Sequence, residues 1–367
     1  MKNVLITGTF RSGTSLLTTV LSAHKQVAIA WQPYWSFFKA CRNKFFKEII
    51  RKPFDPDYPM GILQFAPGKE RALLPDIFNL VKFDRPELMS AISQIKSDLS
   101  YEDEKMNRDM KPAGLGKYLD DVEPGTAGDV LSQLMERLYL YEIGTNRANK
   151  ADLKIVGIKE VFCEEYMEPI LAYQGLDSVV LHIIRDPRGV VASRNYGKYM
   201  EATGSKYPIF FIIRSWRRTV ANYILNKDKK NYLMIKYEDL VSQPEKILNK
   251  VCNLSGVPFS EDILDLDKFR DSVGNRWTPN TSFESSKTIN TASINRWNSV
   301  LSSEEIEVIE YFCQSELRLL RYEIMTKYFD VERISNFHED MANIKHWLRQ
   351  YDFREDVKKT RVMVRTE

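Results

Sequence analysis

The chain has 367 residues, of which 43% are hydrophobic and 28% charged, as is typical of a globular protein. Its 53 basic and 50 acidic side chains leave a formal net charge of +3, which is too small to indicate a nucleic-acid-binding protein. No run approaches the ~18 apolar residues of a membrane span, and the first residues leave no room for a signal peptide, so the sequence predicts a cytoplasmic protein that binds no membrane.

Alternating apolar runs and amphipathic stretches indicate the fold class. Four short, mainly apolar runs are expected strands, at residues 4–6, 154–158, 178–184 and 232–235, and the third is rich in β-branched residues. Stretches with apolar residues at helical spacing are expected helices, at residues 14–23, 190–199, 244–254 and 302–322. Strands that alternate with helices predict an α/β protein with a central parallel sheet flanked by helices on both faces.

Two long intervals, at about residues 30–120 and 258–300, read as irregular and are rich in aromatic residues, proline and charge. Because long loops in compact domains are usually functional, we expect these intervals to form an acceptor pocket and its lid. The prediction is one domain over residues 1–330, with a helical extension over 331–367 packed on its outside.

The first candidate site follows the first expected strand. Glycines at Gly8 and Gly13 allow a tight turn, and the helix that follows supplies unpaired N–H groups and the positive end of its dipole, so this loop can hold a phosphate. The spacing nearly fits the ATP-binding loop G-x-x-x-x-G-K-[ST], but Thr14 stands in place of the lysine. A cation stands three positions earlier, at Arg11, which suits a donor that reacts at its 5'-phosphate end. An ordinary glycine turn with a capped helix is the alternative.

A second candidate site follows the third expected strand. Arg185 ends this strand and Pro187 suits the first turn of the next helix. Arg185 offers a two-pronged donor for a phosphate, and Ser193, about two turns into the helix, offers a hydroxyl. Taken alone, such an arginine more often pairs with a carboxylate.

Together the two motifs resemble the PAPS-dependent sulfotransferase family, in which PAPS is 3'-phosphoadenosine 5'-phosphosulfate. The loop at Arg11 resembles the arginine-containing 5'-phosphosulfate loop of the Golgi and tyrosylprotein branches. The segment 185–193 resembles the 3'-phosphate motif. Further matches follow in order at Tyr237-Glu238-Asp239-Leu240, Pro244, Gly256 and Arg296-Trp297.

The resemblance implies the fold and the residue roles. It implies a P-loop NTPase-like sulfotransferase fold that binds PAPS, releases PAP and requires no metal; the scattered cysteines and histidines likewise show no zinc-ligand spacing. The implied nucleotide-binding residues are Arg11, Ser12, Gly13, Thr14, Ser15, Arg185, Ser193, Tyr237 and Arg296. The implied catalytic cations are Arg11 and Lys159, although a solvated strand-end lysine is an equal alternative for Lys159.

The general base and the acceptor are less well determined by the sequence. The tyrosylprotein branch has a glutamate where this chain has Gln32, and an amide takes no proton at neutral pH. Glu160 is the candidate base, with the charge run 102–104 as an alternative. The expected acceptor-binding residues are Trp31, Gln32, Tyr34 and Trp35. They would contact a small molecule such as a natural product, which would receive the sulfuryl group on a hydroxyl or on an amine or guanidine nitrogen. A core role for these aromatic residues is the alternative.

Two other functions stay open at this point. A metabolite kinase with a degenerate phosphate loop is one, although the missing lysine at Thr14 opposes it. A catalytically inactive protein that binds PAP or another nucleotide is the other, and Gln32 favours it. The oligomeric state is not predicted.

Overall fold

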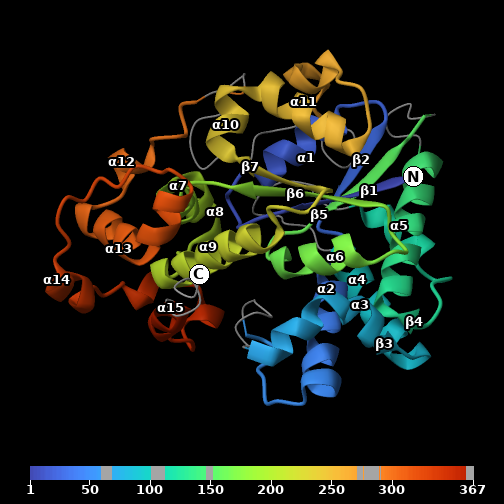
Figure 1. Cartoon of the computed structure of the whole chain (residues 1–367), viewed down its shortest axis with the longest axis horizontal. Helices are drawn as coiled ribbons and strands as arrows, with labels where there is room; N and C mark the ends of the chain where they lie inside the picture. The colour runs from blue at the N-terminus through green and yellow to red at the C-terminus, as the bar shows by residue number, and fades with distance from the viewer. Residues whose placement is uncertain are drawn as a thin grey trace.

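The computed structural model describes residues 1–58, 68–100, 112–145, 152–270, 276, 289 and 291–360. Its centre is a five-stranded sheet of order β2-β5-β1-β6-β7 in which all neighbouring strands are parallel (Figure 1). The strands are β1 Lys2–Thr7, β2 Val27–Trp31, β5 Ile155–Lys159, β6 Ser178–Ile184 and β7 Tyr232–Lys236. A separate antiparallel pair joins β3 Lys82–Phe83 to β4 Gly125–Thr126. The expected α/β class with a parallel sheet is confirmed.

Helices cover both faces of the sheet, because the strand side chains are apolar on both sides. Val4 and Ile6 pack in one core cluster, while Leu5 between them packs in another. The first face carries α1 Thr14–Ser22, α10 Tyr237–Ser242 and α11 Pro244–Ser255, seen above the sheet in Figure 1. The second carries α2 Trp35–Lys44, α3 Ile77–Leu80, α4 Arg85–Leu99, α5 Ala127–Gly144 and α6 Met167–Ala172.

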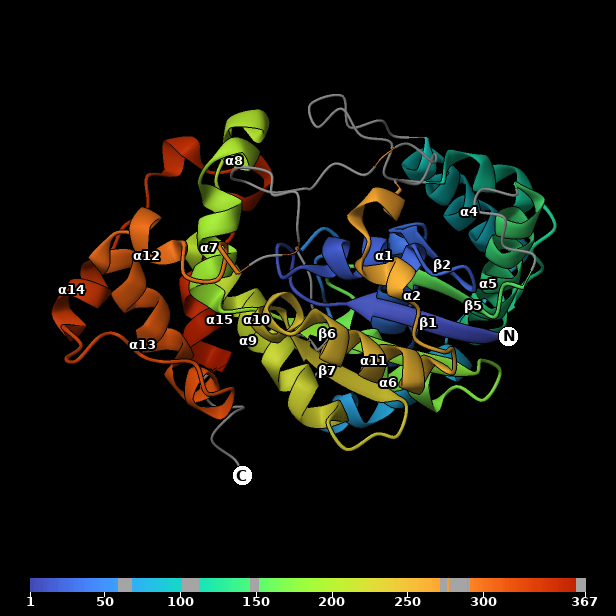
Figure 2. The ribbon, with the colours of Figure 1, turned by 90° about the horizontal axis from the view of Figure 1, so that it is seen from above.

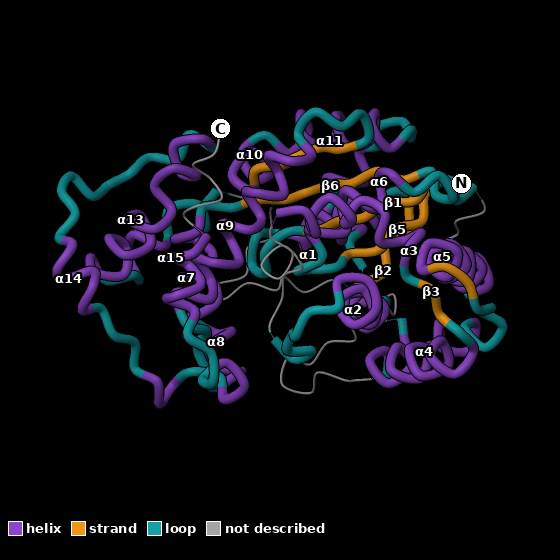
Figure 3. The backbone as a smooth tube through the Cα atoms, turned by 60° about the horizontal axis from the view of Figure 1, so that its bottom comes forward, coloured by secondary structure: helices purple, strands orange, loops and turns teal. Residues whose placement is uncertain are grey.

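A further group of helices packs beside the carboxyl ends of β6 and β7 (Figures 2 and 3). Its members are α7 Pro187–Asn195, α8 Lys198–Thr203, α9 Ile209–Asn226, α12 Trp297–Val300, α13 Ser303–Leu319, α14 Val331–Asn336 and α15 Phe353–Thr360. Helix α15 lies against α9, where the rings of Phe353 and Phe211 are 5.0 Å apart. The division of the chain at residue 330 stays a prediction.

The four expected strands and four expected helices are present, with some corrections. The helix expected at 190–199 begins at Pro187, where the Asp186 carboxylate accepts a hydrogen bond from the Arg188 amide, and it ends at Asn195. The prediction that the interval 30–120 is irregular is wrong, because α2 and α4 lie within it. Strand β2 was not predicted.

Some polar groups are buried in the core. His182 is fully buried in β6 and its Nδ1 lies 2.7 Å from the Tyr232 hydroxyl. Burial lowers the pKa of His182 to about 3, so its imidazole stays neutral. The four cysteines are buried and unbridged. Among the residues that the structure describes, no helix is long and apolar enough to cross a membrane.

Candidate nucleotide and sulfuryl-transfer site

The loop between β1 and α1 has an unusual backbone. Gly8 has φ 149°, Gly13 has φ 102° and Arg11, which is not a glycine, has φ 61°. The amide of Ser12 donates to the Thr9 carbonyl over 3.2 Å, which closes a turn with Arg11 at its third position. The Ser12 hydroxyl is fully buried, yet it has no hydrogen-bond partner among the described residues. A buried hydroxyl without a partner at a helix N-terminus fits a site for an anion.

Tyr237 closes this loop from the side of β7. A Cβ atom built on Gly13 would lie 2.4 Å from the Tyr237 ring, so only glycine permits this approach. The Tyr237 hydroxyl lies 2.6 Å from the Ser293 hydroxyl. The pairing of Gly13 with Tyr237 explains why two segments more than two hundred positions apart must both be present for the site to form.

Gly13→Ala is expected to weaken PAP binding at least tenfold, because the new methyl group displaces the Tyr237 ring and strains the left-handed backbone. Gly204→Ala is the matched control, since Gly204 has φ 63° but nothing lies within 4 Å of the Cβ that alanine would add. Calorimetric titration with PAP measures the effect. Equal affinities of the two variants would contradict the prediction.

Arg185 lies at the end of β6 and points to the loop. It is 7% exposed, and its guanidinium donates to the carbonyls of Arg11 over 3.1 Å and of Ser293 over 2.9 Å. The same guanidinium lies 4.3 Å from the centre of the Tyr237 ring. These hydrogen bonds go to neutral carbonyls rather than to a carboxylate. Glu238 is a nearby counter-charge, but the groups that accept hydrogen bonds from Arg185 are neutral, so the arrangement favours an anionic ligand here.

The two candidate sites are in direct contact. The Arg11 Nε donates to the Ser193 hydroxyl over 3.0 Å. Arg11, Ser12, Gly13, Arg185, Ser193 and Tyr237 are thus joined by these contacts. Ser293 belongs to the same group but was missed, because a lone serine in a long loop carries no sequence signal.

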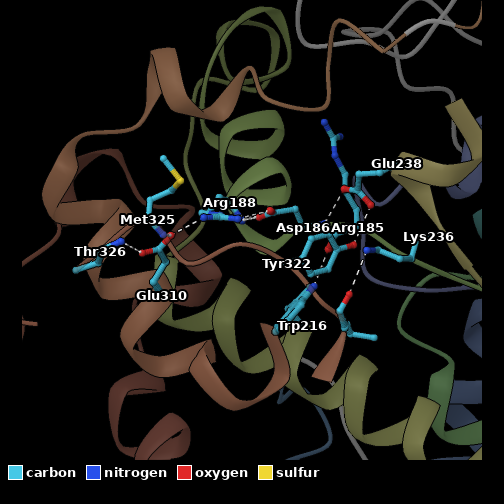
Figure 4. Close-up of polar contacts among 11 residues, drawn as sticks. Arg185, Asp186, Arg188, Trp216, Lys236, Glu238, Glu310, Tyr322, Met325 and Thr326 are labelled. Carbon is cyan, nitrogen blue, oxygen red and sulfur yellow. Dashed lines mark hydrogen bonds and ion pairs between the residues drawn. The ribbon is translucent and has the colours of Figure 1, made fainter. Parts of the chain in front are cut away.

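A polar network fixes the chain around Arg185 (Figure 4). The Trp216 indole donates to the Arg185 carbonyl over 2.7 Å, and the Asp186 amide donates to Glu238 over 3.0 Å. Burial raises the pKa of the Glu238 carboxyl, which also accepts a 2.8 Å hydrogen bond from the Tyr322 hydroxyl. The network holds the backbone while leaving the Arg185 side chain directed at the loop.

Arg188 belongs to this network and not to the candidate site. It pairs with Asp186 at 2.6 Å and with Glu310, and lies 4.0 Å from the centre of the Trp297 ring. Burial disfavours its charge, but the hydrogen bond to Asp186 and the charges of both carboxylates outweigh burial and raise the Arg188 pKa. Its positive charge is therefore neutralised within the protein.

Lys159 lies at the carboxyl end of β5, beside the end of β2. It is 3% exposed, so it is not a solvated strand-end lysine. Its ammonium donates to the Gln32 side-chain carbonyl over 3.3 Å and lies 4.9 Å from the centre of the Trp31 ring. Gln32 has φ 44°, and its backbone amide donates to the backbone carbonyl of Lys159 over 2.8 Å. Lys159, Gln32 and Trp31 therefore form one group at the sheet edge that also carries the loop between β1 and α1, residues 8–13, called the donor loop below.

The other acceptor and base candidates have contacts of their own within the fold. The Tyr34 ring is fully buried and its hydroxyl donates to the Leu134 carbonyl over 2.6 Å, which favours the core alternative for this residue. Glu160 is also fully buried, and its carboxylate accepts the Tyr34 amide over 2.7 Å. Trp35 is partly buried and lies beside Lys39. The alternative base segment 102–104 lies outside the described residues.

The remaining nucleotide candidates lie at the starts of helices. Thr14 and Ser15 begin α1, with Thr14 buried and Ser15 partly exposed. Arg296 directly precedes α12 and is partly buried. Among the described residues, no group of three or more histidine, cysteine, aspartate or glutamate side chains could hold a metal ion.

Part of the chain is similar to known sulfotransferases. Residues 175–329 match the family model described as the sulfotransferase domain. Carbohydrate sulfotransferase 2 of Homo sapiens is 24% identical over 225 residues, which cover 50% of this chain and 42% of that protein. Carbohydrate sulfotransferase 7 of Rattus norvegicus is 20% identical over 94% of this chain and 79% of its own length. The chain thus spans less than half the length of the first relative.

A solved structure, the sulfotransferase domain from the curacin biosynthetic pathway, matches with a TM-score of 0.47 and 16% identity, covering 88% of this chain and 99% of that one. The domain match begins within the segment leading to β6 and contains Arg185, Ser193, Tyr237 and Arg296. Residues 175–329 are therefore similar to the sulfotransferase domain, the family that the sequence motifs resemble.

Proposed function

We propose that this protein transfers the sulfuryl group of PAPS to a small acceptor and releases PAP. The observation that carries the proposal is the contact between two cationic sites, in which Arg185 donates to the Arg11 carbonyl and Arg11 donates to Ser193. An adenosine bisphosphate has two phosphates on one ribose, so two adjoining anion sites suit it. The Ser12 hydroxyl, which has no partner in the described part of the chain, and the carbonyl-bound Arg185 are both donors that a phosphate would engage.

The proposed reaction is an in-line displacement. A lone pair of the acceptor oxygen forms a bond to sulfur, the bond from sulfur to the 5'-phosphate oxygen breaks, and that oxygen keeps the bonding electrons. The acceptor proton passes to a base or to water. Arg11 and Lys159 stabilise the charge that develops on the leaving oxygen and on the transferring group. Glu160 stays the candidate base, although its carboxylate accepts the Tyr34 amide.

The acceptor side is formed by Trp31, Gln32 and Lys159. Lysine is only a donor, so the Gln32 oxygen faces Lys159 and its NH₂ group is the part left to meet an acceptor. Such a group hydrogen-bonds an oxygen. The relatives named carbohydrate sulfotransferases also favour a hydroxyl over an amine or guanidine nitrogen. A cytoplasmic role in natural-product biosynthesis remains part of the proposal.

Two assays test this function. Titration with PAP is expected to give micromolar or tighter affinity, whereas Mg-ATP is expected to bind at least tenfold more weakly, because Thr14 replaces the lysine that would hold a γ-phosphate. PAP release from PAPS is then measured with sugars, phenols and amines as acceptors. Tighter binding of Mg-ATP would support the kinase alternative, and PAP binding without turnover of any acceptor would support a binding-only protein.

A further inference from the structure

A buried chain of hydroxyl and carboxyl groups lies beneath the donor loop. The Thr9 hydroxyl lies 2.7 Å from the Thr219 hydroxyl of α9. Thr219 in turn donates to Glu164 over 2.6 Å, and the other Glu164 oxygen pairs with Arg218 at 3.4 Å. All four residues are at most 4% exposed. These hydrogen-bonded groups join the loop after β1 to α9 and to the segment after β5.

The direction of these hydrogen bonds follows from the number of protons. A threonine hydroxyl has one proton, and that of Thr219 is donated to Glu164. The Thr219 oxygen can then only accept, so Thr9 is the donor between the two hydroxyls. The side chain of Thr9 is thereby held in one orientation.

Thr9 is also the first residue of the turn that carries Arg11. Its carbonyl accepts the Ser12 amide, and Arg11 occupies the third position with φ 61°. That position ordinarily requires glycine, and an L-residue there is held only where the surroundings impose the conformation. Arg185 restrains the turn from one side through the Arg11 carbonyl. The Thr9 side chain restrains it from beneath.

We propose that Thr219 and Glu164 are positioning residues for the donor loop, which fix Thr9 and so hold the left-handed backbone that directs Arg11. Neither residue was suggested by any sequence motif. The consequence for catalysis rests on the proposed function of Arg11, but the effect on the loop does not. Because Glu164 lies a few positions after Lys159, the last residue of β5, these hydrogen bonds also position the donor loop relative to the acceptor side.

The test compares Thr219→Val with Thr219→Ser. Valine keeps the shape but removes the hydroxyl, whereas serine keeps the hydroxyl. Hydrogen exchange of the amides at residues 9–13 is expected to accelerate about tenfold in Thr219→Val, with residues 178–184 unchanged, and to be restored within twofold in Thr219→Ser. Thr18→Val is the matched control, because Thr18 is equally buried in α1 and its hydroxyl has no hydrogen-bond partner in the described part of the chain.

Turnover gives a second measurement. Sulfuryl transfer from PAPS to water or an active acceptor is expected to fall about tenfold in Thr219→Val, while the affinity for PAP changes less than threefold. The double variant Thr9→Val with Thr219→Val is expected to be no worse than Thr219→Val alone, since each substitution removes the same hydrogen bond between the two hydroxyls. Unchanged loop exchange, uniform acceleration throughout the fold, or failure of serine to restore the loop would overturn the inference. If the wild-type protein does not bind PAP, the proposed function is wrong. The hydrogen-exchange rates of the loop amides still decide the role of Thr219 in that case.

Discussion

Arg11→Ala is expected to reduce sulfuryl transfer from PAPS by about a hundredfold to a thousandfold. The reason is that a fixed donor at the leaving oxygen acts mainly on charge that develops in the transition state, and loss of one such donor typically has an effect of this size. PAP already carries its full charge and retains Arg185, Ser12 and the amides of the loop. Its affinity is therefore expected to change less than about fivefold. Steady-state kinetics and PAP calorimetry measure the two effects separately.

Two further variants serve as comparisons for Arg11→Ala. Arg11→Lys keeps a charge but loses the planar fork and its Nε hydrogen bond to Ser193, so partial activity is expected. Arg51→Ala is the matched control, because Arg51 also has a positive φ, 56°, but is exposed and lies beyond α2. Wild-type turnover in Arg11→Ala would refute the catalytic role, and a loss of PAP affinity as large as the loss of turnover would reassign Arg11 to ground-state binding.

The sequence predicted those parts of the site that have a local cause. Glycines, hydroxyls and a helix start define the donor loop within eight positions, and Arg185 followed by Pro187 marks a strand end and a helix start. Strand β2 was missed because its short apolar run, with two alanines, does not distinguish a strand from a helix. Helix α9 was missed for a related reason, since its apolar residues are buried on almost every side.

The rest depends on contacts between distant segments. Helix α9 carries Arg214, Arg217 and Arg218 in its buried face, and a run of arginines normally indicates an exposed surface. Two of their partners, Glu164 and Glu316, lie 54 and 99 positions away from Arg218 and Arg217, respectively, so no spacing rule connects them. The same holds for Ser293, which meets Arg185 across 108 positions. Residue types alone cannot tell which of Arg185 and Arg188 is neutralised internally; the side-chain positions of Asp186 and Glu310 show that it is Arg188.

Arg185→Ala is expected to weaken PAP binding by roughly tenfold to a hundredfold, the usual effect of removing charge-assisted hydrogen bonds to an anion. Arg185 also holds the Arg11 and Ser293 carbonyls, so a loss of affinity alone does not show which phosphate it contacts. A comparison of two ligands separates these contributions. Adenosine 5'-phosphate lacks the 3'-phosphate but is otherwise the same as PAP.

If Arg185 binds the 3'-phosphate, the wild-type protein prefers PAP over adenosine 5'-phosphate, and Arg185→Ala abolishes most of that preference while binding adenosine 5'-phosphate almost normally. If the residue only supports the loop, the variant weakens both ligands equally and the preference stays. The preference of Arg185→Lys for PAP is expected to lie between those of the wild-type protein and Arg185→Ala, because a single ammonium cannot reach the two carbonyls and a phosphate together. The ratio of the two dissociation constants in each variant therefore measures the coupling between this side chain and this phosphate, independently of any change in fold stability.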